Sequence, residues 1–287
     1  MQDTIVAGVD GSPPSHAAVR AATSWAACAR GPLLLVHAVP GSSGRADRRA
    51  AVAAEELLER ERAIALATLP GLEVETAVVV GDPMWALARA ATGARAVVVG
   101  SHKTGFLRGT AFGSSPLQLV AAATSPVVVV PATVDEAAVG VVVGLDYSPD
   151  GVAALDAGIR HARARGDDLL IVRATGGHPR QRGDGGDRHE GDPVARSASA
   201  RDTDMMERAR ERAERLHPGL VVRSRLVAGP PAPTLLRLSS RAALLVVGRS
   251  RAEAGEAPIA VGRATHDVLL NLAAPTVVVS AEHSPSA

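Results

Sequence analysis

The chain has 287 residues, a formal net charge of +1, one cysteine, and 46% hydrophobic residues. A charge so close to zero excludes the whole-chain basic field of many nucleic-acid-binding proteins, and a lone cysteine cannot form an internal disulfide. No apolar run approaches the roughly 18 residues that span a membrane, and the first residues lack the pattern of a signal peptide. We therefore expect a cytoplasmic protein that contacts neither nucleic acid nor membrane.

The first half of the chain alternates short apolar segments with longer segments of helical pattern. This alternation is typical of βαβ units and a parallel sheet, and a core of Ala, Val and Leu suits a sheet that is covered on both faces. Strands are predicted at residues 5–9, 33–39, 73–80, 96–100 and 127–130, and helices at 15–29, 50–69, 84–91 and 114–123.

The second half repeats the order of the first. Residues 141–146 repeat 5–10, residues 169–174 (LLIVRA) repeat 33–38 (LLLVHA), and the final strand at 276–279 repeats 127–130. Such self-similarity predicts a tandem duplication. We expect a first domain at 1–132, a linker at 133–138 and a second domain at 139–282.

One segment of the second half has no counterpart in the first. Residues 176–204 are rich in Gly, Arg and Asp and have almost no apolar side chains. A segment of this composition cannot bury enough apolar surface to fold. We therefore predict a disordered insertion at 176–204.

Residues 97–114 combine a buried strand, a Gly-rich loop and a helix start. The loop contains Gly105 and Gly109, and it also carries Lys103, the only lysine of the chain. Free backbone N–H groups and the positive end of a helix dipole can bind an anion such as a phosphate. The alternative is an ordinary strand–helix loop with flexible glycines, and the stretch by itself does not distinguish the two.

Two motifs in this setting carry a family resemblance. Gly100, Lys103 and the pair Gly113-Ser114 have the spacing of Gly-x-x-Gly, nine residues, then Gly-Ser/Thr, and Asp10 closes the first strand in Val-Asp-Gly-Ser. Because these motifs occur together with the predicted order of strands and helices, each half resembles the universal stress protein domain. The whole chain resembles the tandem members of that family that are common in actinobacteria.

The resemblance implies two tandem five-stranded parallel-sheet domains of the Rossmann-like, adenine nucleotide α-hydrolase-like class, related by a pseudo-two-fold axis. It also implies a stress-response or signalling module that binds ATP, with or without Mg²⁺, at the carboxyl ends of strands one and four. By position, the adenosine would meet Gly8, Val9, Asp10 and Ala38, and the ribose and phosphates would meet Val99, Gly100, Lys103, Gly113, Ser114 and Ser115.

The sequence departs from the family pattern at several positions. Lys103 replaces the second motif glycine, so its side chain either crowds the phosphates or supplies a compatible cation, and we favour the cation. In the second half the spacing is one residue longer, and Arg251 and Arg263 replace motif residues. Arg249, Arg251 and Arg263 could still clamp an anion, but we favour a purely structural second half with one nucleotide site in the first.

No catalytic or metal-binding constellation stands out. His37, His102 and Asp10 are placed by the strand order near one sheet edge, but nothing indicates a base within reach of a nucleophile. The chain is therefore not expected to be an enzyme beyond slow ATP hydrolysis. Trp25 and Trp85 lie on helical faces and are expected to pack against the sheet.

Two functions of different classes remain open at this point. One is the adenine-nucleotide-binding module, and the other is a scaffold that binds no nucleotide and acts through protein contacts. The strands at 127–130 and 276–279 are predicted to pair with each other within one chain, as family members pair this strand on dimerising, and so to cover each other's edges. Association of two chains as a homodimer is compatible with this arrangement.

Overall fold

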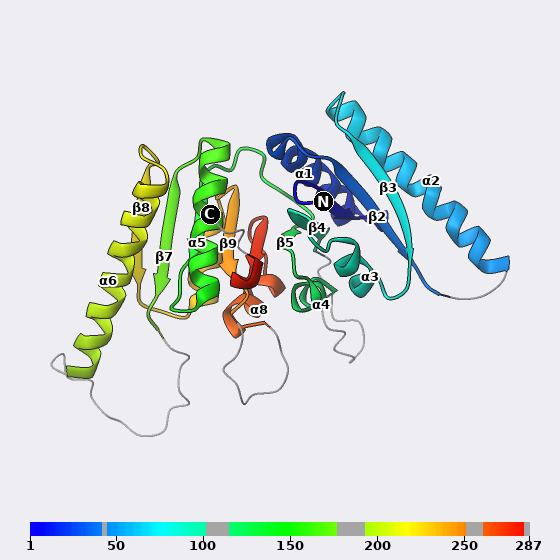
Figure 1. Ribbon diagram of the computed structural model, residues 1–287. Coiled ribbons are helices and arrows are strands. Elements are labelled where there is room, and N and C mark those ends of the chain that lie inside the picture. The colour runs from blue at the N-terminus through cyan, green and yellow to red at the C-terminus, as the bar shows by residue number, and fades with distance from the viewer. Residues whose placement is uncertain (42–44, 102–114, 177–192, 251–260, 284–287) are drawn as a thin grey trace, which may run out of the picture.

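The computed structural model describes residues 1–41, 45–101, 115–176, 193–250 and 261–283. Its strands form one ten-stranded sheet with the order β3-β2-β1-β4-β5-β10-β9-β6-β7-β8 (Figure 1). Neighbouring strands within each half are parallel, and the central pair β5–β10 is antiparallel. The predicted fold class of two tandem five-stranded parallel sheets is therefore confirmed.

The two halves contain the same sequence of elements. The first consists of β1 (Ile5–Gly8), α1 (Pro13–Ala29), β2 (Leu33–Val39), α2 (Arg45–Thr68), β3 (Val74–Val80), α3 (Pro83–Ala90), β4 (Ala96–Gly100), α4 (Ser115–Ala122) and β5 (Val127–Val130). The second consists of β6 (Val141–Gly144), α5 (Pro149–Arg165), β7 (Leu169–Ala174), α6 (Pro193–Leu216), β8 (Val222–Val227), α7 (Pro231–Ser239), β9 (Leu244–Gly248), α8 (Arg263–Leu270), β10 (Thr276–Val279) and the short helix η1 (Ala281–His283).

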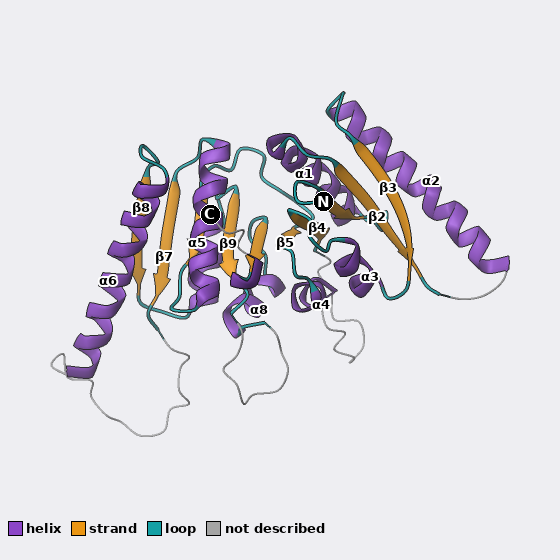
Figure 2. Ribbon diagram, viewed as in Figure 1, coloured by secondary structure: helices purple, strands orange, loops and turns teal. Residues whose placement is uncertain are grey.

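Helices cover both faces of the sheet (Figure 2). One apolar core joins the sheet to α1, α2, α5 and α6, and the other joins the opposite face to α3, α4, α7 and α8. Strands buried on both faces read as continuous apolar runs, which is why VVVV and TVVV segments are found at the centre.

The antiparallel pair β5–β10 joins the two halves. Val128 lies opposite Val277, and both side chains are almost completely buried. The same core includes side chains from both strands, so the apolar interior is continuous across the join. The predicted pairing of these two strands within one chain is confirmed.

Arg249, which the sequence analysis named as a residue that could clamp an anion, extends across this join. Its side chain is 6% exposed. The guanidinium donates to the carbonyl of Ala123 (3.3 Å), just after α4, and to Ser280 Oγ (2.9 Å). A cation at the end of α4 also complements the helix dipole. Nη2 also pairs with the Glu282 carboxylate (3.3 Å). The idea that Arg249 clamps a ligand anion is therefore wrong, because the side chain is buried and these donors are bound to protein groups of both halves.

The prediction of disorder is wrong for the second part of the insertion. Helix α6 begins at Pro193, and it includes residues 193–204, while residues 177–192 lie outside the described part of the chain. Asp202 is buried and accepts hydrogen bonds from Arg173 Nε (2.9 Å) and from the Tyr147 hydroxyl (2.7 Å). These contacts cannot be predicted from composition, because the polar residues of this helix are stabilised by partners far away in the sequence.

The two tryptophans differ in their surroundings. Trp25 of α1 packs against the core and against the His161 ring of α5, with ring centroids 4.7 Å apart. Burial, together with the guanidinium groups of Arg160, Arg95 and Arg165, lowers the pKa of His161 to about 4. Trp85 is 64% exposed, so the expectation that it packs on the sheet is wrong, and its neighbours Ala86 and Leu87 form the buried face of α3.

Replacing Arg249 with Ala tests the contact across the join. The substitution removes the hydrogen bonds to Ala123 and Ser280, so the free energy of unfolding is expected to fall by about 1–3 kcal/mol. Urea unfolding followed by circular dichroism measures this change. Arg237→Ala is the matched control, because Arg237 is exposed on α7, and it should change the free energy by less than about 0.5 kcal/mol. Equal effects of the two substitutions would contradict the assigned role of Arg249.

His161 predicts a pH dependence of stability. Its folded pKa of about 4 lies below the value of about 6.5 in an unfolded chain, so the unfolded state binds more protons between these two pH values. The contribution of His161 to the free energy of unfolding is therefore unchanged above pH ~6.5 and falls as the pH drops from ~6.5 toward ~4. His161→Gln should unfold with a shallower pH dependence in this window than the unsubstituted protein, and urea unfolding at several pH values measures it. An unchanged dependence in His161→Gln would show that the histidine is not held neutral in the folded protein.

Candidate functional site

A cavity of about 220 Å³ opens at the carboxyl ends of the first-half strands. This is the edge at which open parallel sheets bind ligands. Gly8, Val9, Asp10, Ala38, Val99 and Gly100, which the sequence analysis proposed, all line it. The remaining lining residues are Ser15, Val36, His37, Pro83, Met84, Leu87 and Pro116.

The other proposed residues belong to the Gly-rich stretch. Lys103, Gly113 and Ser114 lie outside the described residues. Ser115 is the first residue of α4, and its side chain also lies outside the description. The described part of the site is therefore the end that the resemblance assigns to adenosine.

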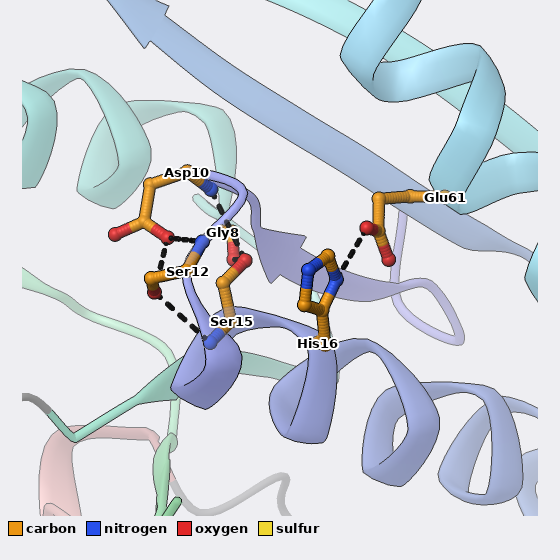
Figure 3. A network of polar contacts seen from close by, with 6 residues as sticks. All are labelled: Gly8, Asp10, Ser12, Ser15, His16 and Glu61. Carbon is orange, nitrogen blue, oxygen red and sulfur yellow. Dashed lines mark hydrogen bonds and ion pairs between the residues drawn. The ribbon is translucent and has the colours of Figure 1, made fainter.

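Asp10 stands at the mouth of the cavity in a network of short-range hydrogen bonds (Figure 3). Its Oδ1 accepts from the backbone N–H of Ser12 (2.9 Å) and from the Ser12 hydroxyl. Ser12 Oγ in turn accepts from the N–H of Ser15 (3.3 Å) and so caps α1. The Asp-Gly-Ser motif therefore fixes the carboxylate at a helix N-terminus, where the helix dipole favours a negative charge.

Two glycines line the cavity at positions where no side chain fits. A Cβ on Gly8 would lie 2.8 Å from a Leu87 methyl group and 3.1 Å from Val99. A Cβ on Gly100 would lie 2.3 Å from the backbone of Pro14, so β4 approaches the start of α1 too closely for any side chain. These contacts explain why glycine closes both β1 and β4.

The apolar wall was missing from the sequence-based site. Val36 comes from β2, and Met84 and Leu87 come from α3. Asp82 positions this helix, because its Oδ1 accepts from the backbone N–H groups of Met84 (3.1 Å) and Trp85 (3.2 Å). The Gly-Asp-Pro turn before α3 could have indicated this wall, because it predicts a helix that starts beside the carboxyl end of β3.

The histidines near the site have structural partners. His37 Nδ1 lies 2.6 Å from the Val9 carbonyl, so this nitrogen carries the proton and donates to it. His16 of α1 pairs with the buried Glu61 of α2 (Figure 3), and His102 lies outside the described residues. Within the described ranges, no group of three or more His, Cys, Asp or Glu side chains could hold a metal ion.

The second half has an equivalent cavity of about 280 Å³. Arg173 stands where the first half has His37, and it stacks over the Tyr147 ring at 4.7 Å while it pairs with Asp202. The lining residues are Gly144, Leu145, Asp146, Val172, Arg173, Ala174, Pro231, Leu235, Val247, Gly248, Ser250, Gly262, Arg263, Ala264 and Thr265.

The fold and its two cavities define a tandem α/β protein in which each half carries a pocket at the carboxyl ends of a parallel sheet. Residues 1–131 and 140–280 each match the model of the universal stress protein family. The chain therefore belongs to the universal stress protein family. Among the described residues, no helix has both the length and the apolar character needed to cross a membrane.

Relatives of the same tandem length support this membership. Universal stress proteins of Mycobacterium bovis and Mycobacterium tuberculosis are each 29% identical to the chain, over 98% of it and 96% of the relative. A solved universal stress protein from Archaeoglobus fulgidus has a TM-score of 0.69 at 16% identity, over 96% of both chains. A solved protein from Pseudomonas aeruginosa, described as a putative universal stress protein, has a TM-score of 0.65 at 16% identity, over 97% of this chain and 93% of the other. At these identities the two structures establish the fold alone.

Proposed function

We propose that this universal stress protein is an adenine-nucleotide-binding stress-response or signalling module with one ATP site, in the first half. The observation that carries the proposal is the first-half cavity, in which an apolar slot ends at the fixed carboxylate of Asp10. An apolar slot with a few fixed polar groups is the usual form of a small-molecule site.

The described residues suit the adenosine part of ATP. Val36 and Ala38 on one side and Met84 and Leu87 on the other offer apolar surface to a flat base. A carboxylate is an acceptor only, so Asp10 is matched to the hydroxyl groups of a ribose, and hydrogen bonds to a charged group are the stronger ones.

The phosphate part rests on the family motif. Lys103, Gly113, Ser114 and Ser115 are the residues proposed to hold the phosphates, with Mg²⁺ as a companion ion. In this proposal the Lys103 ammonium supplies the positive charge that backbone N–H groups provide when glycine occupies the position.

The proposal assigns binding and not catalysis to this site. His37 is committed to the Val9 carbonyl, and no described side chain forms a nucleophile–base pair at the cavity, so hydrolysis would be slow at most. A cytoplasmic location and association of two chains belong to the same proposal. The competing function is a scaffold that binds no nucleotide.

Filling the first cavity tests the site. Ala38→Phe places a ring in the apolar slot, so the affinity for ATP should fall at least about tenfold, which corresponds to about 1.4 kcal/mol. Ala174→Phe is a matched control, because Ala174 occupies the equivalent place in the second cavity, and it should bind ATP as the unsubstituted chain does. Equilibrium dialysis with labelled ATP measures both, and circular dichroism checks that the variants are folded.

The two hypotheses give different outcomes in this experiment. No binding above background by the unsubstituted protein would reject the nucleotide function and favour the scaffold. Binding that survives Ala38→Phe would reject the assignment of the site to the first cavity.

A further inference from the structure

We propose that copies of this chain associate head to tail, with the β8 edge of one copy forming an antiparallel pair with the β3 edge of the next. In the described part of the chain these two strands end the sheet on opposite sides, and each has a neighbouring strand on one side only (Figure 1). An edge strand offers a row of backbone N–H and C=O groups to another strand. The inference goes beyond the proposed function and does not depend on nucleotide binding.

The join at the centre of the sheet shows that this kind of pairing fits the fold. There β5 and β10 pair antiparallel, and the apolar core on each face continues across them. All strands within each half run parallel, so β8 runs antiparallel to β3. A second copy placed beside the first in the same orientation therefore presents an antiparallel partner strand.

The outward side of β3 is defined by its pairing with β2. The Glu73 carbonyl accepts from the N–H of the first residue of β2 (2.9 Å). Backbone groups of successive strand residues point to opposite sides, so those of Thr76 and Val78 point away from the sheet. The Val74 carbonyl also points outward and accepts from Arg62 Nε (3.1 Å), but a carbonyl oxygen has two lone pairs and can accept a second donor.

The outward side of β8 follows in the same way. The Val227 carbonyl accepts from the N–H of Thr175, just after β7 (2.9 Å). The backbone groups of Ser224 and Leu226 therefore point away from the sheet. Outward groups must meet outward groups, and only two registers that satisfy this condition overlap the two strands over nearly their whole length.

One of these registers pairs opposite charges. It places Thr76 opposite Ser224, so that Glu75 lies opposite Arg225. Both charged side chains belong to exposed residues. Residues directly opposite each other in an antiparallel pair have their side chains on the same face and in contact, and pairs of opposite charge or of hydroxyl groups stabilise the pairing. Charge complementarity therefore favours a second copy as the occupant of each edge.

The same register joins apolar side chains on the other face of the sheet. Val78 lies opposite Val222, and both pack against the core beneath α2 and α6. Val74, which is buried in that core, lies opposite Leu226, which is 42% exposed. A second copy would cover Leu226 and continue this core from chain to chain, as the β5–β10 pair continues it within the chain.

The second register loses these matches. It places Thr76 opposite Leu226, so an apolar side chain faces a hydroxyl group. Glu75 then lies opposite Val227, and Arg225 lies opposite Ala77, so neither charge meets its opposite. The register with Glu75 opposite Arg225 is therefore the one that we assign.

Reversing one charge at a time tests the assigned pairing. Glu75→Arg sets two arginines opposite each other, and Arg225→Glu sets two glutamates opposite each other. Each variant should associate about 3- to 30-fold more weakly than the unsubstituted chain, because like charges replace opposite ones. Sedimentation velocity over a range of protein concentrations measures the association, and circular dichroism checks that the variants are folded. The average mass of the unsubstituted chain should rise beyond that of a dimer, because head-to-tail contacts add further copies.

An equimolar mixture of the two variants is the sharpest arm of the test. The introduced arginine of Glu75→Arg meets the introduced glutamate of Arg225→Glu, and the remaining edges of the two variants carry the natural opposite charges. The mixture should therefore associate as strongly as the unsubstituted chain. Glu136→Arg in the linker and Arg237→Glu on α7 are the matched controls, since they make the same charge changes at exposed positions away from both edges and should change nothing.

A backbone substitution tests the edge without changing any charge. Thr76→Pro removes an N–H that points away from β2, so the substitution leaves the β2–β3 pairing intact and should weaken the association. A monomeric unsubstituted chain at every concentration would overturn the proposal, and so would unchanged association of the charge-reversed variants. An assembly that stops at a dimer, with Arg225→Glu unaffected, would show that β3 pairs with β3 and would overturn it as well. Failure of the mixture to recover would reject the assigned register.

Discussion

The antiparallel pairing of β5 with β10 is the interaction on which the rest of the structure depends. Each half has one short, mostly apolar strand at its inner edge, and either edge would be open to aggregation if it were left unpaired. The pairing covers both edges and makes the apolar core on each face of the sheet continuous across the two halves. Because it joins two copies of one fold, it also places two equivalent cavities in a single chain.

Polar contacts across the join make the two halves unequal. Arg249 of the second half bonds to the end of α4 in the first half. The residue equivalent to Arg249 in the first half is Ser101. The neighbouring residue, Ser250, is bonded to Asp146 and Asp150. One short segment after β9 thus contributes both to the join and to the second cavity, whereas the cavity of the first half follows the family pattern more closely.

The fold could be predicted almost entirely from the sequence, because apolar runs and the internal repeat are local signals. Strands β2, β4 and β5 have the predicted bounds, and the other first-half elements differ by a few residues at their ends, mainly where caps such as Ser12 and Asp82 start a helix earlier. Asp10, Val99 and Gly100 of the first cavity were predictable for the same reason, since they lie at the ends of β1 and β4, whereas Ser15 was not predicted. Helix α6 was not fully predictable, because the pairing of Asp202 with Arg173 brings together residues that the sequence separates.

The directions in which side chains point could not be predicted from the sequence either. Arg249 belongs to a segment rich in arginine, and only the structure shows that its guanidinium is buried between Ala123 of the first half and Ser280 and Glu282 of the second. The hydrogen bond of Ser250 to Asp146 could not be predicted either, because it joins residues that are 104 positions apart and Ser250 has an unusual φ. The same holds for Met84 and Leu87, whose place in the first cavity depends on how α3 lies against β1 and β4.

The central claim is that two cavities of one fold differ, so that a single nucleotide binds in the first half. The most direct measurement is a crystal structure of the unsubstituted chain grown with ATP. We expect one nucleotide per chain, with its base between Ala38 and Leu87 and its ribose at Asp10, and no nucleotide in the second cavity. A nucleotide at Asp146, or no nucleotide in either cavity at saturating ATP, would show that the assignment of one site to the first half is wrong.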